Sequence, residues 1–164
     1  MATIENLSFT DNSSAIRDKF SSLIANTPSR IIYNGWLISK PAINLSRKAL
    51  IYDDPIKISI VGSIHPGKGQ HEAIKALSIL KNSFSGISLD IVGVGGDSYI
   101  RELKELCSFL SVSSIVTWVG FSNNVAEIYQ RSDIAFVCSR SEAFGRVVVE
   151  AMAESCPVVG SRSG

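Results

Sequence analysis

The chain has 164 residues, which is enough for one domain with a hydrophobic core. Hydrophobic residues make up 45% and charged residues 19%, a composition typical of globular proteins rather than disordered ones. The formal net charge is +1 and the basic residues form no block, which argues against nucleic acid as a partner. No apolar run is long enough to span a bilayer, and no segment has the pattern of a signal peptide. The three cysteines, Cys107, Cys138 and Cys156, lack metal-ligand spacing and predict reduced thiols in a cytoplasmic protein.

The first fifty or so residues differ from the rest of the chain. Residues 1–28 are rich in Ser, Asn and Thr, with one weakly amphipathic stretch at 15–24. A short apolar run that starts at Arg30 ends in the turn dipeptide Asn34-Gly35. Residues 37–55 carry no clear period, and we interpret them as a linker.

From Lys57 onward, strand-like and helix-like patterns alternate. Runs of β-branched and other apolar residues predict strands at 57–64, 88–94, 115–120, 133–139 and 157–161. Apolar residues at helical spacing predict helices at 70–81, 99–110, 125–130 and 145–154. The first two helices are expected to turn inward Ala73, Ile74, Leu77 and Leu80, and then Ile100, Leu103, Leu106, Cys107 and Leu110. This alternation predicts an α/β domain with a Rossmann-like, doubly wound parallel sheet, in which ligands bind beyond the carboxyl ends of the strands.

The loop after the first predicted strand carries Lys68 between two glycines, directly before a helix. The lysine supplies a point charge and the helix end supplies N–H groups, so the pattern indicates an anion site. The spacing is not that of a Walker loop, and a solvated surface lysine is the alternative. The glycine turn at 93–97 allows either a ligand to approach the backbone or simply a tight turn. His65 and His71 are too isolated for a metal site, and His71 is expected to be exposed.

The segment after the fourth predicted strand, residues 139–152, is the most informative. Glu142 precedes a predicted helix and Glu150 falls two turns inside it, while Gly145 leaves the first turn of the helix open to approach. Helix N–H groups suit a diphosphate, and carboxylates suit sugar and ribose hydroxyls. The alternative is that Glu142 only favours the helix start and that Glu150 is solvated. Because the neighbours of Glu150 are apolar, we expect it to have a dedicated partner.

The sequence from about Ile58 to Gly164 resembles the C-terminal domain of family 4 (group 1) glycosyltransferases. Four motifs carry the resemblance: VGSIHPGKGQHEAIKAL, LDIVGVGG, VTWVGF with AEIYQRSDIAFVCSRSEAFGRVVVEAMA, and CPVVGSRSG. The third contains two glutamates separated by seven residues, Glu142 and Glu150. The resemblance implies the C-terminal half of a GT-B fold and transfer of a sugar from a UDP- or GDP-sugar to a glycan or lipid-linked acceptor. It also implies retention of the anomeric configuration, with no required cofactor or metal.

The resemblance further implies roles for individual residues. Lys68 and Glu142 are the expected catalytic residues, Lys68 at the donor diphosphate and Glu142 at the donor sugar. Glu150 would bind the ribose. The other expected substrate-binding residues are Gly62 and Ser63, Gly120 and Phe121 facing the base, and Ala143, Phe144, Gly145, Arg146 and Val147. The sequence departs from the family at Ser63, where most members have an arginine, and Arg146 or His65 could replace that charge. Cys156 stands where most members have a glycine.

The resemblance also divides the chain. We expect residues 1–56 to be the tail of a preceding domain with an interdomain linker, and residues 57–164 to be a nucleotide-sugar-binding domain truncated at its C-terminus. The acceptor domain would be missing, so the fragment alone would be inactive, and any peripheral membrane contact would belong to the full-length protein. Two alternatives stay open: a GT-B-type sugar-nucleotide epimerase, and a non-catalytic nucleotide-binding or interaction module. A dehydrogenase is disfavoured because the G-x-G-x-x-G fingerprint is absent.

Overall fold

A computed structural model describes residues 9–11, 13–24, 29–32 and 54–162. The N-terminal part contains strand β1 (Phe9–Asp11), helix α1 (Ser14–Ile24) and strand β2 (Ser29–Ile31), and the two strands pair in parallel. Ser13 caps the helix, because its side-chain oxygen accepts a hydrogen bond from the Ile16 N–H at 3.2 Å. Helix α1 covers the weakly amphipathic stretch at 15–24. The turn at Asn34-Gly35 and residues 37–53 of the expected linker lie outside the described residues.

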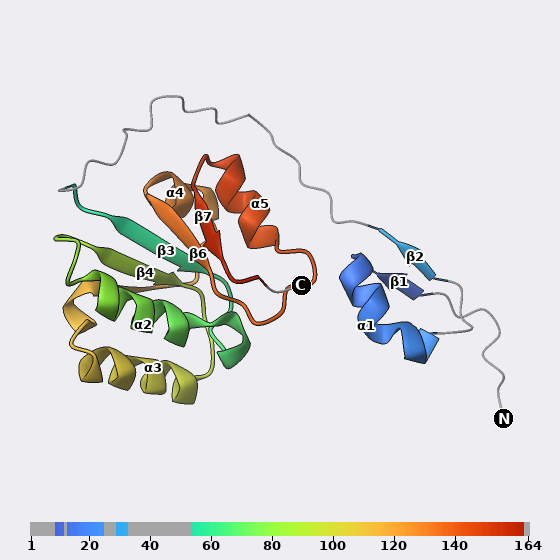
Figure 1. Cartoon of the computed structure of the whole chain (residues 1–164), viewed down its shortest axis with the longest axis horizontal. Coiled ribbons are helices and arrows are strands. Elements are labelled where there is room, and N and C mark those ends of the chain that lie inside the picture. Colours follow the sequence, from blue (N-terminus) through green and yellow to red (C-terminus); the bar gives the residue numbers. More distant parts are fainter. Residues whose placement is uncertain (1–8, 12, 25–28, 33–53, 163–164) are drawn as a thin grey trace.

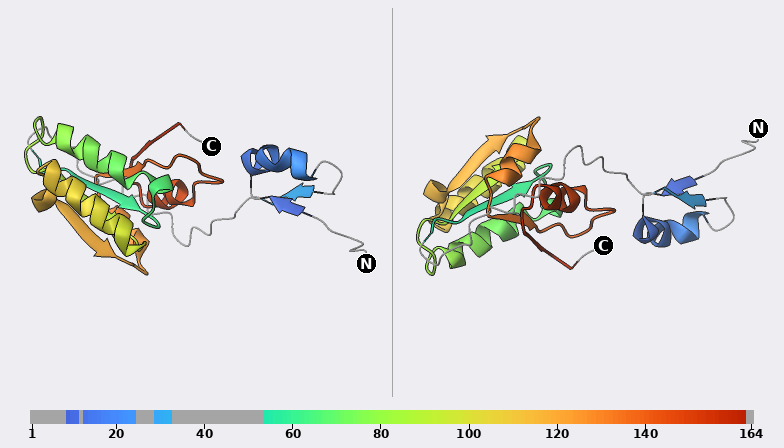
Figure 2. Two further views of the ribbon diagram at one scale, coloured as in Figure 1. Left: turned by 90° about the horizontal axis from the view of Figure 1, so that it is seen from below. Right: turned by 90° about the horizontal axis from the view of Figure 1, so that it is seen from above.

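The larger part is the predicted α/β fold, with five parallel strands in the order β5-β4-β3-β6-β7. Helices α2 and α3 lie on one face of the sheet, and α4 and α5 lie on the other (Figure 1 and Figure 2). None of the helices within the described ranges is long and apolar enough to cross a membrane. The strands are β3 (Lys57–Val61), β4 (Ser88–Val92), β5 (Val116–Gly120), β6 (Ile134–Val137) and β7 (Val158–Gly160). The helices are α2 (Gln70–Leu80), α3 (Asp97–Phe109), α4 (Val125–Gln130) and α5 (Arg146–Ala153).

Several strands end earlier than the sequence predicts. Strand β3 ends at Val61 and strand β4 at Val92, and each is followed by a glycine with positive φ that turns the chain out of the strand. The backbone then pairs irregularly, as the Gly93 N–H donates to the Gly120 carbonyl at 2.8 Å. The shortening leaves the site loops longer than the sequence patterns suggested.

The main core lies between the sheet and the helices α2 and α3. Ala73, Ile74 and Leu77 of α2 are fully buried, which confirms the predicted inward face of that helix. Leu103 and Cys107 of α3 are buried beside them, and the other predicted inward residues of both helices pack around this core partly buried. A smaller core on the other face of the sheet is formed by Tyr129, Ala135, Ala151 and Cys156.

A charged cluster stabilises the start of the central strands. The Asp90 carboxylate, which is only 3% exposed, contacts the Lys57 ammonium at 3.3 Å and the Arg131 guanidinium at 3.3 Å. Lys57 precedes the buried part of β3, and Arg131 follows α4, so the cluster ties the second helical layer to the sheet. A buried carboxylate that has two cationic partners is compensated, whereas one without them is strongly destabilising.

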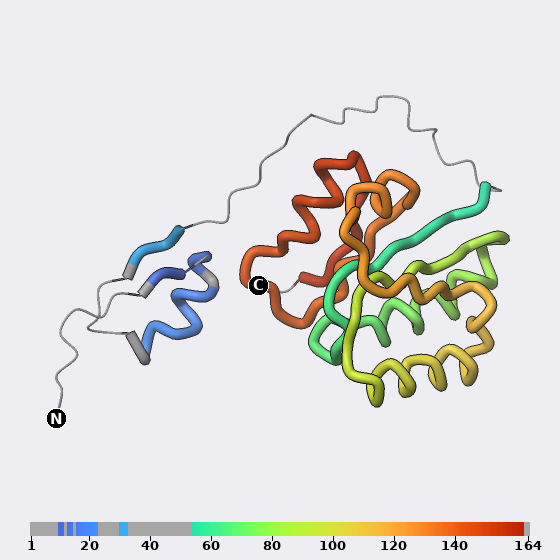
Figure 3. The backbone as a smooth tube through the Cα atoms, turned by 180° about the vertical axis from the view of Figure 1, so that it is seen from behind, coloured from blue at the N-terminus to red at the C-terminus, as the bar shows by residue number. Residues whose placement is uncertain are grey.

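The connections between strands change from one face of the sheet to the other at its centre, between β3 and β6. After β3 the chain runs to α2 on one face, and after β6, the neighbouring strand, it runs to α5 on the other face (Figure 3). The carboxyl ends of β3 and β6 therefore form the topological switch point, where open α/β sheets bind their ligands.

The turn at Gly69 is one of the positions where the fold leaves no room for a side chain. Gly69 has φ 72, and a Cβ added there would lie 2.1 Å from the Cys138 carbonyl oxygen. We expect Gly69→Ala to lower the free energy of unfolding by about 3 kcal/mol or more, because strain and a backbone clash add. Gly96→Ala, where φ is -69 and the added Cβ meets nothing within 4 Å, should change it by less than about 1 kcal/mol. Urea unfolding of both variants measures the difference, and equal losses would contradict the prediction.

Candidate functional site

The β3–α2 loop, residues 62–69, is held by one of its own side chains and by a side chain of the helix that follows it. His65 caps the short 3-10 turn Pro66–Lys68, since its Nδ1 accepts from the Gly67 N–H at 3.1 Å. Gln70, which is 1% exposed, donates from its side-chain amide to the Ser63 carbonyl at 2.9 Å. These bonds fix the backbone on both sides of Lys68.

The β6–α5 loop, residues 138–145, lies against this first loop. The Arg140 N–H donates to the Gly67 carbonyl at 3.0 Å, and the Lys68 ammonium donates to Oε1 of Glu142 in a close ion pair. Ser139, which is buried, also donates to Glu142 Oε1, at 2.6 Å. The structure thus brings together Lys68 and Glu142, two predicted site residues that lie 74 positions apart in the sequence.

Two effects compete in setting the pKa of Glu142. Partial burial would raise the pKa, because it disfavours the charged form. The hydrogen bonds from Lys68 and Ser139, together with the positive charge of Lys68, outweigh burial and hold the pKa below its ordinary value of 4.5. Glu142 is therefore an anion at neutral pH.

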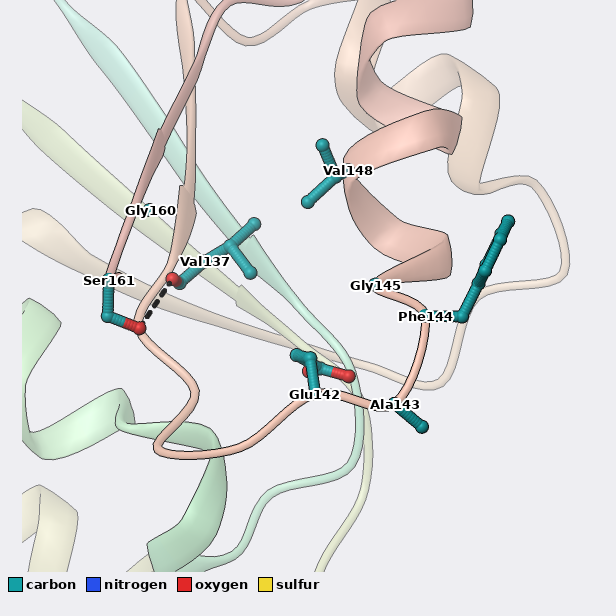
Figure 4. A pocket seen from close by; sticks show the side chains of 8 residues that line it. All are labelled: Val137, Glu142, Ala143, Phe144, Gly145, Val148, Gly160 and Ser161. Atoms are coloured by element: carbon teal, nitrogen blue, oxygen red, sulfur yellow. Dashed lines mark hydrogen bonds between the residues drawn. The ribbon is translucent and has the colours of Figure 1, made fainter. Parts of the chain in front are cut away.

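Glu142, Ala143, Phe144 and Gly145 separate two hollows at the start of α5. A hollow of about 250 Å³ lies between the loop and the sheet, where the side chains of Val137 and Val148 approach each other while Phe144 points away (Figure 4). Its remaining lining residues are Gly160 and Ser161. A second hollow of about 230 Å³ lies on the other side and is completed by Lys68, Arg146 and Val147.

Gly145 sets the entry into α5. It has φ 71, a left-handed conformation that favours glycine, and its carbonyl accepts the first hydrogen bond of the helix from the Val148 N–H at 2.8 Å. The helix therefore begins at Arg146, one residue later than predicted, and its amino end faces the second hollow.

Glu150 lies about one turn further along α5, in a cleft of about 320 Å³ between α4 and α5. Its side chain is 14% exposed and pairs with the Arg146 guanidinium at 3.4 Å, so the expected partner is present. Burial, and then the negative charge of Glu150, raise the pKa of the neighbouring Tyr129. The cleft is also lined by Asn123, Asn124, Val125, Ala126, Tyr129 and Glu154.

The remaining predicted site residues lie at the same edge of the sheet but farther from Glu142. Gly62 and Ser63 begin the β3–α2 loop, and Ser63 is exposed. Gly120 ends β5 and Phe121, which is 72% exposed, follows it; neither is among the residues that line the three hollows. The expectation that His71 is exposed is wrong, because its side chain is 18% exposed and its ring contacts the Tyr99 hydroxyl at 3.2 Å and the Glu72 carboxylate at 3.0 Å.

Some residues of the site were missed by the sequence reasoning. Ser139 lies three positions before Glu142, and a serine at this spacing from a loop carboxylate was an available signal. Asn124 caps α4, since its side-chain oxygen accepts from the Glu127 N–H, and the cap signal could have placed it beside the cleft. Ser161 donates to the Ser139 carbonyl at 2.5 Å, a contact that depends on the pairing of β6 with β7.

Comparison with known proteins identifies the family of this chain. The model of the family described as glycosyl transferases group 1 matches residues 42–164. An uncharacterized glycosyltransferase of Methanocaldococcus jannaschii is 31% identical, over 100% of this chain and 44% of that protein. The D-inositol 3-phosphate glycosyltransferase of Rhodococcus erythropolis is 31% identical, over 76% of this chain and 30% of that protein.

Solved structures of glycosyltransferases share this fold. The crystal structure of Anabaena HepE in complex with UDP and glucose matches 94% of this chain with a TM-score of 0.78 and 28% identity, and 44% of the HepE chain is covered. The chain thus spans less than half the length of these relatives. The five-stranded parallel sheet is that of GT-B glycosyltransferase structures. On the family match over residues 42–164, the chain belongs to the glycosyltransferase group 1 family.

Proposed function

We propose that this chain supplies the donor site of a glycosyltransferase and binds a nucleoside-diphosphate sugar at the carboxyl ends of β3 and β6. The observation that carries the proposal is the meeting of Lys68 and Glu142 beside the start of α5. A diphosphate needs a cation and N–H donors, and a sugar needs acceptors for its hydroxyls. Residues from two loops supply both kinds of group within one hollow.

In this proposal Lys68 and the first turn of α5 bind the diphosphate, and Glu142 binds the donor sugar. Both hydrogen bonds to Glu142 use Oε1, which leaves Oε2 to accept from a sugar hydroxyl. Residues 143–147 border the sugar and phosphates, with Gly62 and Ser63 beside them, while Glu150 binds the ribose hydroxyls in its cleft. The base then lies towards Gly120 and Phe121, the far end of the same edge of the sheet.

The reaction we propose transfers the sugar to a glycan or lipid-linked acceptor with retention at the anomeric carbon. The bond from that carbon to the diphosphate oxygen breaks, and the leaving oxygen keeps the electron pair. The acceptor oxygen forms the new bond and its proton passes to the leaving diphosphate, so the products are the glycosylated acceptor and the nucleoside diphosphate. Lys68 stabilises the charge that develops on the leaving diphosphate. The two-glutamate motif and family membership support this reaction. UDP in the HepE structure favours a UDP-sugar over a GDP-sugar as the donor.

The domain division follows from the same proposal. Residues 57–164 form the donor-binding domain, and residues 1–56 belong to the preceding domain and the linker. The acceptor then binds to parts of the protein outside 57–164, so this chain alone binds the donor without transferring the sugar. Membrane contact, where the acceptor is a lipid, belongs to the full-length protein.

Calorimetric titration with UDP, GDP, ADP and NAD tests the donor site. We expect one nucleoside diphosphate to bind and NAD not to bind. Lys68→Ala should weaken the binding by about tenfold, because a charge-assisted contact to phosphate is lost. Lys75→Ala is the matched control. It removes a lysine of α2 whose side chain is 53% exposed and pairs with Glu72. Binding of NAD, or an equal loss in the control, would contradict the proposal.

The lowered pKa of Glu142 makes the stability of the site depend on pH. The folded-state pKa lies below 4.5, so the contribution of Glu142 is present at neutral pH and is lost as the pH falls through the folded value. We expect Glu142→Gln to be less stable than the natural chain at pH 7, by no more than about 1 kcal/mol for a partly exposed pair. The difference should shrink as the pH falls below 4.5.

Urea unfolding of both proteins at several pH values measures this difference. The matched control is Glu105→Gln, which removes an exposed carboxylate of α3. A stability difference between Glu142→Gln and the natural chain that stays constant from pH 7 to pH 3 would show that the ion pair with Lys68 does not set the pKa.

A further inference from the structure

The site contains two ion pairs of the same kind, one on each side of the start of α5. Lys68 pairs with Glu142, and Arg146 pairs with Glu150 at 3.4 Å. Each pair joins a cation suited to phosphate with a carboxylate suited to hydroxyls. Lys68 and Arg146 line the same hollow of about 230 Å³, and Arg146 also lines the cleft that holds Glu150.

Pairing each carboxylate with a cation reduces the electrostatic repulsion between the site and its ligand. A donor carries its negative charge on the diphosphate, and two bare carboxylates beside that position would repel it. With both carboxylates paired to cations, the ligand-free site is close to neutral. A diphosphate with several charges is then a stronger partner for each cation than a single carboxylate is.

We propose that the diphosphate of the donor takes both cations from their carboxylates, so that binding exchanges two internal ion pairs for two phosphate contacts. The proposal rests on the donor site proposed above and adds the Arg146 side chain as the second diphosphate cation. Glu142 and Glu150 are released in the same step, and each is then available to the sugar or the ribose.

The ion pair between Arg146 and Glu150 is easily exchanged for another contact. The Arg146 side chain is 64% exposed, and its contact with Glu150 spans one helical turn, a geometry that stabilises weakly. A small rotation of the exposed side chain moves the guanidinium between the cleft and the neighbouring hollow, because Arg146 lines both.

Glu150, unlike Arg146, is largely buried, with 14% of its side chain exposed. It loses its ionic partner when Arg146 moves to the diphosphate. A largely buried carboxylate needs a replacement for that partner. The ribose diol of a nucleotide can supply one, and inorganic pyrophosphate cannot. The exchange therefore makes the site prefer a nucleoside diphosphate over pyrophosphate, although pyrophosphate carries more charge for its size.

Pyrophosphate binding by the full chain, measured by calorimetry, tests the exchange. We expect Arg146→Gln to weaken pyrophosphate by about tenfold and Arg146→Lys to keep most of the affinity. Glu150→Gln should tighten pyrophosphate by about threefold, because Arg146 no longer has to leave a carboxylate. In the Arg146→Gln background the same Glu150→Gln change should alter the affinity by less than about 1.5-fold.

Matched controls keep these results interpretable. Arg140→Gln removes an exposed arginine of the β6–α5 loop that lines a separate hollow with Tyr99 and Glu102, and it should leave pyrophosphate affinity unchanged. Circular dichroism melting of each variant confirms that it folds. With UDP in place of pyrophosphate, Glu150→Gln should lose the tightening, because the ribose contact is removed together with the ion pair.

The outcomes separate the two proposals. If the natural chain binds neither UDP nor pyrophosphate, the donor site and the exchange are both wrong. If it binds them but Glu150→Gln tightens pyrophosphate equally with and without Arg146, simple charge repulsion explains the gain. The exchange is then wrong and the donor site stands. An unchanged pyrophosphate affinity in Arg146→Gln likewise overturns the exchange alone.

Discussion

The carbonyl oxygen of Cys138 occupies the space where a side chain at position 69 would begin, and only a glycine there allows the two loops to meet so closely. The loops leave neighbouring strands for opposite faces of the sheet, and the parallel pairing of β3 with β6 places their starting points side by side. Lys68 precedes the contact by one residue, and Glu142 follows it by four. Their ion pair, and the hydrogen bond between the Arg140 N–H and the Gly67 carbonyl, exist because the backbones meet there. The rest of the site is arranged around that meeting.

A site for a nucleotide sugar must combine groups that oppose one another. Cations and helix N–H groups bind phosphates, whereas carboxylates bind hydroxyls, and the two kinds of ligand group are joined in one molecule. Placing the carboxylates in the loop before α5 and inside that helix puts them on either side of the cations. Before a ligand arrives, each carboxylate has its own cation, which keeps both charges compensated.

The sequence was sufficient for the topology and insufficient for the contacts. Alternating strand and helix patterns from Lys57 onward predicted the parallel sheet, and helical spacing predicted the buried face of α2, because both depend on local periodicity. Strand β1 was missed, since three residues are too few to show a period. The partner of Glu150 lies four residues away and follows from helix geometry, as the apolar neighbours suggested. The pair of Lys68 with Glu142 spans 74 residues, and the exposure of His71 depends on Tyr99, so neither follows from a local pattern.

The cluster of Lys57, Asp90 and Arg131 has a consequence for how this family can diverge. Changing Asp90 alone leaves two cations facing each other, and changing both cations leaves a buried carboxylate without compensation. A lineage that loses the cluster must therefore pass through intermediates of low stability, unless an apolar residue replaces Asp90 at a time when the fold has stability to spare. The three positions are expected to be inherited together, and an alignment of relatives should show them changing as a group.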